Sequence, residues 1–346
     1  MSEHNQGRND GTFSFVTGST SARIISSNRQ SCIDVVREAY LAHEHGRSVN
    51  PFSLFLRFPD RPNDRIIALP AYIGQPWDVS GIKWIASYPD NVRKGFPRAS
   101  AVLLLNSHDT GYPFACMEAS IISAARTAAS AALAAEQLIG PAKTIRTFAV
   151  IGAGLIARYV YSFLLGTGWD IENVVVFDIE RAEAERFTTH VCEREKHSSL
   201  AVSDTLESAV SVADLVLFAT VAAKPHFHDA TCLKHNPVVL HISLRDIAPQ
   251  LLVNAFNVVD DVDHIMRAET SVHLAETLTG SRDFISGTLA QVIEGVCRVD
   301  RSRPIFFSPF GLGVLDLAVG KWVYDQAVAA GDNINVPDFF YETQRV

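Results

Sequence analysis

The stretch Thr147-Phe148-Ala149-Val150-Ile151-Gly152-Ala153-Gly154-Leu155-Ile156-Ala157 decides the fold. A short apolar run stops at a Gly-x-Gly turn, and a helical pattern begins at once. Gly152 permits a tight turn, Gly154 lets the backbone approach a pyrophosphate, and Ala157 lets the helix lie close to the strand. The N–H groups of Leu155 and Ile156 then open a helix whose positive dipole end favours an anion. The motif predicts a dinucleotide-binding β-turn-α unit.

A second apolar run, Asn173 to Phe177, follows one helix later and ends in Asp178. A carboxylate at this point accepts hydrogen bonds from the adenosine ribose and repels a 2′-phosphate, which favours NAD over NADP. Arg181 lies three residues further on, and an arginine there can receive a 2′-phosphate. The alternative interpretation of the whole stretch is an ordinary β-turn-α crossover that binds no ligand.

Composition restricts the class of protein. The chain has 346 residues, enough for two domains, with 47% hydrophobic residues, 20% charged residues and a net charge of −8. The negative charge argues against nucleic acid and anionic membranes as partners, and no apolar run reaches the length of a membrane span. Residues 1–11 are polar and lack an apolar signal core, so we expect a cytoplasmic protein. The five cysteines have no metal-ligand spacing.

The first part of the chain predicts an antiparallel sheet with helices at its borders. Helical periodicity covers Gln30 to His45, and a long Ala-rich helix covers Ala119 to Ile139. Turn residues separate the expected strands, which are Phe13–Val16, Phe52–Phe58, Arg65–Pro70, Val79–Ser87 and Ala101–Asn106.

From Lys143 onward the pattern alternates between strands and helices, which predicts a doubly wound parallel sheet of the Rossmann type. The later expected strands are Leu200–Val202, Asp214–Ala219, Val238–Ile242, Asn257–Val259 and Phe306–Phe310. The expected helices are Arg181–Lys196, Val262–Leu278 and Gly313–Ala330. We therefore place an α+β domain at residues 1–125, rejoined by residues 313–346, and the dinucleotide-binding domain at residues 126–312.

Isolated cations in the first half are candidates for binding an anionic substrate. Arg57 and Lys83 interrupt expected strands, and Arg126 interrupts a helix of small apolar residues. A lone arginine in such a helix must reach solvent or pair with an anion, and its guanidinium binds carboxylates bidentately. The alternative for each is an ordinary surface charge.

A second set of candidates follows the strand that ends near Ile242. Ligands lie beyond the carboxyl ends of the strands in a doubly wound sheet, so Asp246 should stand close to a nicotinamide, and Thr220 lies on the same rim. The alternative role for Asp246 is an N-cap of the next helix. Metal-capable residues at 226–229 and 260–264 have no recognised ligand spacing, so we expect loop and cap roles for them and no metal.

Three segments together resemble the ornithine cyclodeaminase/mu-crystallin family. They are Gly81-Ile82-Lys83-Trp84, Ala124-Ala125-Arg126-Thr127-Ala128-Ala129 and Val150-Ile151-Gly152-Ala153-Gly154-x-x-Ala157-Arg158-Tyr159, and the resemblance covers about residues 16–324. Cyclodeaminases of the family carry an acid in a Glu-Leu-Met-Pro run, which here reads Ile67-Ala68-Leu69-Pro70. Their catalytic aspartate lies in a Gly-Gly-Asp context, which here reads Ser243-Leu244-Arg245-Asp246. Arg98 adds a cation.

These departures resemble a branch that oxidises N-((2S)-2-amino-2-carboxyethyl)-L-glutamate with NAD. The resemblance implies hydride transfer from the glutamate α-carbon and hydrolysis of the imine to 2-oxoglutarate and L-2,3-diaminopropionate, for siderophore or antibiotic biosynthesis. It implies a homodimer formed through the first domain. It assigns Asp246 or Lys83 as the base. It places Arg57, Lys83, Arg98, Arg126 and Arg245 near substrate carboxylates, and Thr127, Thr220 and Ser243 near the cofactor.

Two other functions stay open at this point. One is an ornithine cyclodeaminase or cyclic ketimine reductase, although several cations suit a di- or trianionic ligand better than dibasic ornithine. The other is a mu-crystallin-like protein that holds a dinucleotide and a small ligand without turnover. Formation of NADH from the glutamate adduct would distinguish the enzyme from the binding protein.

Overall fold

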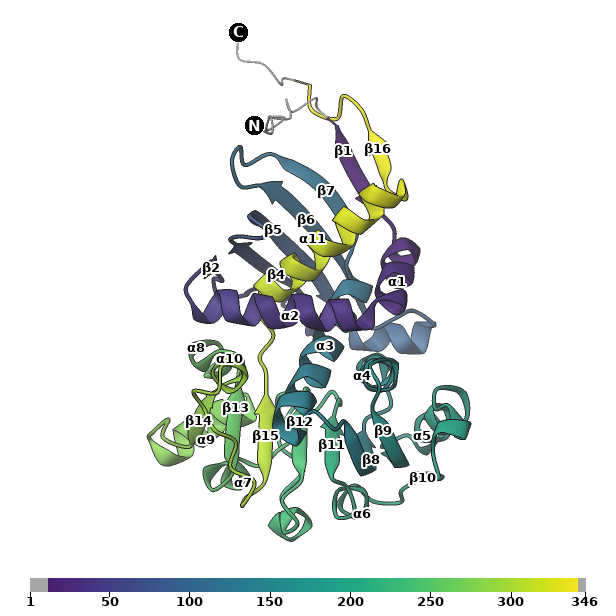
Figure 1. Ribbon diagram of the computed structural model, residues 1–346, viewed down its shortest axis with the longest axis vertical. Coiled ribbons are helices and arrows are strands. Elements are labelled where there is room, and N and C mark those ends of the chain that lie inside the picture. Colours follow the sequence, from purple (N-terminus) through teal and green to yellow (C-terminus); the bar gives the residue numbers. More distant parts are fainter. Residues whose placement is uncertain (1–11, 342–346) are drawn as a thin grey trace. The chain divides into compact units, whose positions relative to one another are not determined.

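The computed structural model describes residues 12–341 and divides into two compact units (Figure 1). Of the described residues, unit 1 contains 12–28, 45–123 and 312–341, and unit 2 contains 29–44 and 124–311. The helix α2 (Arg29–Glu44) therefore belongs to unit 2, whereas the sequence placed it in the first domain. The polar N-terminal residues 1–11, on which the expected compartment rests, lie outside the described residues.

Unit 1 contains a mixed eight-stranded sheet. Its strand order is β16-β1-β7-β6-β5-β4-β2, and β3 pairs with β4 beside β2. The β1–β7 pair is parallel and the other pairs are antiparallel. The strands are β1 (Phe13–Val16), β2 (Ser48–Val49), β3 (Leu54–Phe58), β4 (Arg61–Ile73), β5 (Val79–Ser87), β6 (Ala99–Ser107), β7 (Pro113–Glu118) and β16 (Ile334–Val336).

The helix α11 (Gly313–Ala330) lies across β4, β5 and β6 of this sheet, and α1 (Gly18–Ser27) packs beside it. Gly320 allows the close approach, because a Cβ there would come within 2.1 Å of Leu103 Cδ2. The bounds of α11 agree with the sequence prediction, whereas α1, β7 and β16 were not predicted.

Unit 2 contains an eight-stranded sheet in which every pair is parallel, as predicted for a Rossmann-type fold. Its order is β10-β9-β8-β11-β12-β15-β13-β14, so the late strand β15 is inserted between β12 and β13. The strands are β8 (Thr144–Ile151), β9 (Asp170–Phe177), β10 (Ser199–Val202), β11 (Leu215–Phe218), β12 (Val238–His241), β13 (Phe256–Val259), β14 (Ile285–Thr288) and β15 (Ile305–Ser308).

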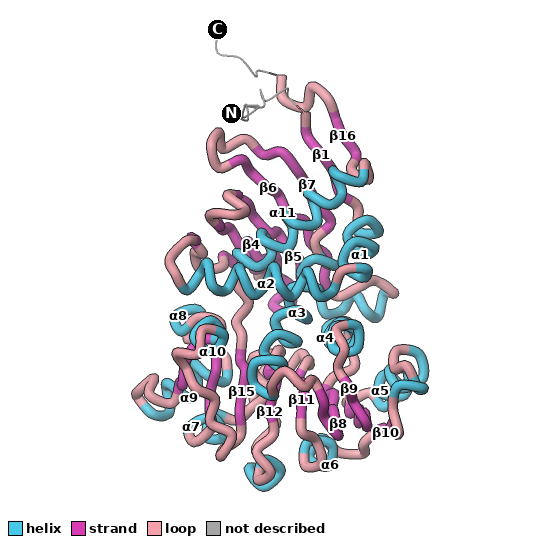
Figure 2. The backbone as a smooth tube through the Cα atoms, in the orientation of Figure 1, coloured by secondary structure: helices cyan, strands magenta, loops and turns pink. Residues whose placement is uncertain are grey.

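Helices cover both faces of the unit 2 sheet (Figure 2). The side chains of β11 alternate between the two faces, and all four are fully buried for this reason. On one face, Ala149, Val216 and Phe306 pack with apolar side chains of α6, α7 and α9. Besides α2, the helices of this unit are α3 (Ser120–Ile139, which begins in unit 1), α4 (Leu155–Gly166), α5 (Arg181–His190), α6 (Leu206–Val210), α7 (Pro249–Val253), α8 (Val262–Ile265), α9 (Ser271–Thr279) and α10 (Leu289–Ile293).

Two predicted helices were too long. The helix predicted for Arg181–Lys196 ends at His190. The one predicted for Val262–Leu278 is broken into α8 and α9. The break has a local cause, because Ala268 and Glu269 adopt φ values of +54° and +53°, and Thr270 then caps α9 by accepting a hydrogen bond from the His273 N–H.

No helix of residues 12–341 combines the length and apolar character required to cross a membrane.

Candidate functional site

The turn between β8 and α4 has the geometry of a dinucleotide-binding loop. Gly152 has a φ of +90°, and a Cβ on it would lie 2.8 Å from the Ala219 carbonyl oxygen, so the position requires glycine. Gly154 is exposed, and a Cβ there would meet no atom within 4 Å. The backbone at Gly154 is therefore open to a ligand.

The N-terminus of α4 offers backbone donors to such a ligand. Its N-cap is Gly154, and within the described part of the chain no side chain caps it. The first N–H groups of a helix have no intrahelical acceptor, so those of Leu155 and Ile156 are suited to an anion. Leu155 is 40% exposed, and Ala157 is fully buried against the sheet. This arrangement fits the pyrophosphate of a dinucleotide.

A substitution of Gly152 tests this turn. Gly152→Ala should lower the free energy of unfolding by about 1–3 kcal/mol, because alanine is strained at this φ. It should also abolish detectable NADH binding, because the added Cβ displaces the turn from Ala219. Fluorescence titration with NADH and thermal melting measure both effects. Gly168→Ala is the control, since Gly168 also has a positive φ of +87° but lies at the far end of α4 with no atom within 4 Å of its Cβ position. Equal loss of NADH binding in both variants would contradict the assignment.

Asp178 follows β9 and holds the glycine turn in place. Its Oδ2 accepts a hydrogen bond from the Ala153 N–H at 2.8 Å, and its Oδ1 accepts one from the Glu180 N–H at 2.9 Å. Nearby, Arg181 donates hydrogen bonds to Asp204 at 2.6 Å and to Glu185 at 3.0 Å. Those two carboxylates compensate the charge of Arg181 and raise its pKa, and Asp204 has the larger effect.

Asp246 lies in the loop after β12 and is completely buried. The hydroxyls of Thr220 and Ser243 donate hydrogen bonds to its two carboxylate oxygens. The ring of His241 lies on the same side, with Nε2 3.5 Å from Asp246 Oδ2. The three residues that surround the carboxylate follow or end β11 and β12, at the carboxyl edge of the sheet.

The alternative role of Asp246 as a helix cap is wrong. The following helix, α7, begins at Pro249, its N-cap is Ala248, and no side chain of the described residues caps it. Thr220 was predicted to share the rim of the sheet with Asp246 and lies beside it, whereas the closeness of Ser243 to Asp246 was not predicted. The hydroxyls of both residues point to the carboxylate.

Hydrogen bonding keeps Asp246 ionised. Burial raises the pKa of its carboxyl, but the hydrogen bond and charge of His241, followed by the hydroxyls of Ser243 and Thr220, lower the pKa by more, so the pKa lies below its usual value. The loop around it is strained at Leu244, which has a φ of +74°. Asp246 is thus a fixed, buried anion.

Two predicted arginines of unit 2 occupy different places. Arg245 is half-buried, and its Nε donates a hydrogen bond to the Ala268 carbonyl oxygen at 3.0 Å. Arg126 lies on α3 beside the turn at Gly311, where a Cβ on Gly311 would lie 2.8 Å from its Nη1. Thr127 follows it and is half-buried.

The predicted cations of unit 1 also differ in exposure. Arg57 is exposed on β3, with its guanidinium carbon 5.2 Å from the centre of the Phe55 ring. Arg98 precedes β6 and donates a hydrogen bond to Ser87 Oγ at 3.2 Å, and burial lowers its pKa.

Lys83 forms a buried ion pair that the sequence analysis missed. Its Nζ lies 2.5 Å from Asp316 Oδ2 on α11 and 3.1 Å from Ser123 Oγ, and the side chains of Lys83 and Asp316 are 2% and 1% exposed. The sequence signal was present, because Asp316 interrupts an apolar helical run. The immediate neighbour of the Lys83 ammonium is therefore a carboxylate.

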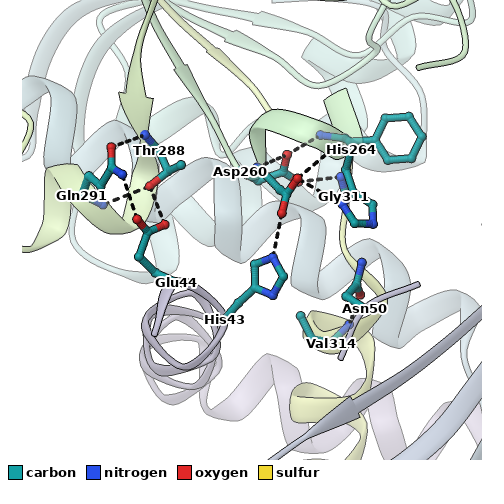
Figure 3. A network of polar contacts seen from close by, with 11 residues as sticks. His43, Glu44, Asn50, Asp260, His264, Thr288, Gln291, Gly311 and Val314 are labelled. Atoms are coloured by element: carbon teal, nitrogen blue, oxygen red, sulfur yellow. Dashed lines mark hydrogen bonds and ion pairs between the residues drawn. The ribbon is translucent and has the colours of Figure 1, made fainter. Parts of the chain in front are cut away.

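The metal-capable clusters have capping and bridging roles. Asp261 caps α8 and accepts a hydrogen bond from the ring of His43 at 2.9 Å, while Asp260 accepts hydrogen bonds from the N–H groups of Phe310 and Gly311 at 2.8 and 2.7 Å (Figure 3). Among residues 12–341 no group of three or more His, Cys, Asp or Glu side chains could hold a metal ion.

A family model described as ornithine cyclodeaminase/mu-crystallin family matches residues 20–331. The chain belongs to the ornithine cyclodeaminase/mu-crystallin family. Within it, the chain is 32% identical to the N-((2S)-2-amino-2-carboxyethyl)-L-glutamate dehydrogenase of Staphylococcus aureus, over 87% of this chain and 91% of that protein. It is 28% identical to the alanine dehydrogenase of Archaeoglobus fulgidus, over 86% and 90% of the two chains.

Solved structures of this family have the same fold. A dimeric archaeal alanine dehydrogenase with bound NAD is 26% identical, covers 94% of this chain and 99% of its own, and has a TM-score of 0.83. A Thermococcus litoralis Δ1-pyrroline-2-carboxylate reductase in complex with NADH and L-proline covers 94% and 100% at 23% identity, with a TM-score of 0.85, which shows the fold. The family and fold predicted from the sequence are confirmed.

Proposed function

We propose that this protein oxidises N-(2-amino-2-carboxyethyl)-L-glutamate with NAD and hydrolyses the resulting imine to 2-oxoglutarate and L-2,3-diaminopropionate. At the coarser level, the chain is an NAD-linked oxidoreductase that acts on the CH–NH groups of amino acids. The glutamate adduct is the substrate of the Staphylococcus aureus relative, which matches most of both chains. We infer that the diaminopropionate formed supplies siderophore or antibiotic biosynthesis in the cytoplasm.

The cofactor assignment depends on the β8–α4 turn. Gly152 and Gly154 leave the backbone open, the α4 N-terminus offers N–H donors to the pyrophosphate, and the Asp178 carboxylate stands where an adenosine ribose would bind. Bound NAD would accept the hydride from the glutamate α-carbon. Thr127, Thr220 and Ser243 are the further residues that we assign to the cofactor.

The substrate assignment depends on charge. The adduct carries three carboxylates, and we assign to them the cations of the two units, namely Arg57, Lys83, Arg98, Arg126 and Arg245. Lys83 is paired with Asp316, which compensates the charge of its ammonium. We propose that this ammonium also donates one hydrogen bond to a substrate carboxylate. Asp246 remains an anion at neutral pH, which suits a residue that stabilises a cationic iminium.

The test is turnover by the purified protein. Adding NAD and the glutamate adduct should form NADH, 2-oxoglutarate and diaminopropionate in equal amounts, measured by absorbance and mass spectrometry. L-Alanine, L-ornithine and L-proline are the comparison substrates. Turnover of one of these with none of the adduct would overturn the substrate. Tight NADH binding without turnover of any of them would favour the binding protein.

A substitution at Asp178 tests the preference for NAD. Asp178→Ser removes the carboxylate that would repel a 2′-phosphate, so NAD should bind more weakly and the ratio of kcat/KM for NAD over NADP should fall by about tenfold or more, equivalent to ~1.4 kcal/mol. Steady-state kinetics with both dinucleotides measure the ratio. Asp204→Ser is a useful companion, because it removes one of the two carboxylates that pair with Arg181 and should also lower the ratio of kcat/KM for NAD over NADP. An unchanged ratio in the Asp178 variant would contradict the assignment.

We also propose a homodimer formed through unit 1. The strand β3 exposes three consecutive apolar residues, Leu54 (68%), Phe55 (38%) and Leu56 (46%), which is unusual for a surface that stays in water. The archaeal alanine dehydrogenase is a dimer. Light scattering should give twice the chain mass of 37.9 kDa.

A further inference from the structure

The loop after β11 presents a histidine at the buried anion Asp246. The His226 N–H donates a hydrogen bond to the Asp246 carbonyl oxygen at 2.9 Å, which fixes the histidine backbone. The ring Nε2 lies 3.7 Å from Asp246 Oδ1. The His226 side chain is 39% exposed, whereas that of Asp246 is completely buried. His226 therefore connects the carboxylate to solvent at the carboxyl edge of the sheet.

We propose that His226 is the residue that moves protons during imine hydrolysis, and that Asp246 orients its ring; this rests on the function proposed above. An aspartate that holds one nitrogen of an imidazole fixes the tautomer and leaves the other nitrogen as a base. In this tautomer Nε2 carries the proton and donates it in a hydrogen bond to Asp246 Oδ1. The lone pair that accepts a proton is then on Nδ1 of His226. The 3.7 Å separation is long, but such contacts often shorten when substrate binds.

Asp246 is poorly suited to accept the proton itself. Its carboxylate is buried and already accepts hydrogen bonds from Thr220 and Ser243, and His241 lies against its Oδ2. His241 is fully buried, and its Nδ1 lies 3.1 Å from Ser308 Oγ, so this ring has no path to solvent. Among Thr220, Ser243, His241 and His226, the groups beside the carboxylate, His226 has the exposed side chain.

Hydrolysis moves two protons from water to the imine nitrogen, and one imidazole can carry them in turn. His226 Nδ1 takes a proton from water as the oxygen bonds to the imine carbon and the C=N electron pair moves to nitrogen. The imidazolium then returns this proton to that nitrogen. As the C–N bond breaks and the carbonyl forms, Nδ1 takes the remaining proton of the former water and passes it to the departing amine, which leaves as an ammonium. The proton lost when the secondary ammonium is oxidised leaves to solvent, so the balance is one NADH and one proton per turnover.

Two of the other charged groups near His226 have their own partners. Arg245 precedes Asp246 and donates to the Ala268 carbonyl oxygen, and Asp229 accepts a hydrogen bond from the Thr231 N–H at 2.8 Å. Lys224 and His228 lie on the same loop and are exposed. Asp246 faces the His226 ring from another element, with 3.7 Å between its Oδ1 and the ring Nε2.

Substitutions on this loop test the proposal. His226→Gln should keep NADH affinity and the melting temperature but lower kcat at least ~10²-fold, the typical contribution of a general acid–base group. The rise of kcat with pH through the neutral range should disappear in this variant. Added imidazole should restore part of the rate to His226→Ala. His228→Gln, two residues away, is the matched control and should keep the wild-type rate. A His226→Gln variant with native kcat and pH profile would overturn the proposal while the substrate assignment stood.

A measurement without turnover separates the two proposals. The ¹⁵N spectrum of histidine-labelled protein, with the His226 signals identified by their loss in His226→Gln, reports which ring nitrogen carries the proton. We expect the Nε2–H tautomer in the wild type and a mixed population in Asp246→Asn. An Nδ1–H tautomer in the wild type would overturn the role of His226, even if the adduct proved not to be the substrate.

Discussion

Replacing Asp316 by asparagine is expected to lower the free energy of unfolding by about 3–5 kcal/mol, because it leaves the buried ammonium of Lys83 without its counter-charge. The pair is 2.5 Å apart with both side chains at most 2% exposed, so water cannot replace the lost carboxylate. Urea unfolding followed by circular dichroism measures the change.

The same helix supplies the control. Asp325 pairs with Lys321 at 2.7 Å, but its side chain is 52% exposed, so Asp325→Asn should cost about 0–1 kcal/mol. Equal losses in the two variants would show that the Lys83–Asp316 pair is solvated. The double variant Lys83→Met, Asp316→Leu should recover much of the stability, since apolar residues can replace a buried pair at little cost.

Replacing Asp246 by asparagine is expected to lower kcat by about 10²–10⁴-fold while NADH affinity is kept. The amide has the shape of the carboxylate but lacks the anion that holds the His226 ring and stabilises the iminium. Stopped-flow hydride transfer, steady-state kcat and NADH titration measure the effect.

The difference in stability between the wild type and this variant should depend on pH in one direction. The pKa of Asp246 is lower in the folded chain, so its contribution to stability is present above the unfolded pKa of about 4 and is lost as pH falls through the folded pKa. The melting temperatures of wild type and Asp246→Asn should therefore converge in acid. Asp229→Asn, on the His226 loop, should leave kcat unchanged. A native kcat in Asp246→Asn would remove Asp246 and its interaction with His226 from the mechanism.

The sequence predicted those turns and helix ends that are determined by neighbouring residues in the chain. The turn at Gly152 could be predicted because a left-handed φ between a buried strand and a helix selects glycine. The helix α11 was predicted to the residue because an apolar run ends at Gly331, which caps it with a φ of +71°. Strand β7 was missed because its polar and apolar residues do not alternate, and helix α1 was missed although its apolar residues gather on one face and Thr17 caps it.

The partners of charged residues could not be predicted, because they depend on long-range packing. Lys83 was recognised as unusual on its strand, but Asp316 lies 233 positions later and reaches it only because α11 crosses β5. Asp246 was placed correctly on the rim of the sheet, but its alternative as a cap could be rejected only from the start of α7. The two hydroxyls that donate to Asp246 belong to Thr220 and Ser243, which lie on different loops. The spacing of these residues in the sequence does not predict their contact.

The position of β15 has a consequence for synthesis on the ribosome. The ribosome synthesises β12 and β13 well before it reaches Ile305–Ser308, which forms β15. In the folded sheet β15 lies between β12 and β13. In unit 1, β1 is synthesised first, but β16, which pairs with it so that Val336 lies opposite Phe13, is synthesised near the end of the chain. Apolar edges of both sheets therefore stay unpaired until late in translation, and such edges aggregate readily. Expression at low temperature or with added chaperones should raise the yield of folded protein, whereas release of chains that stop before residue 305 should give insoluble product.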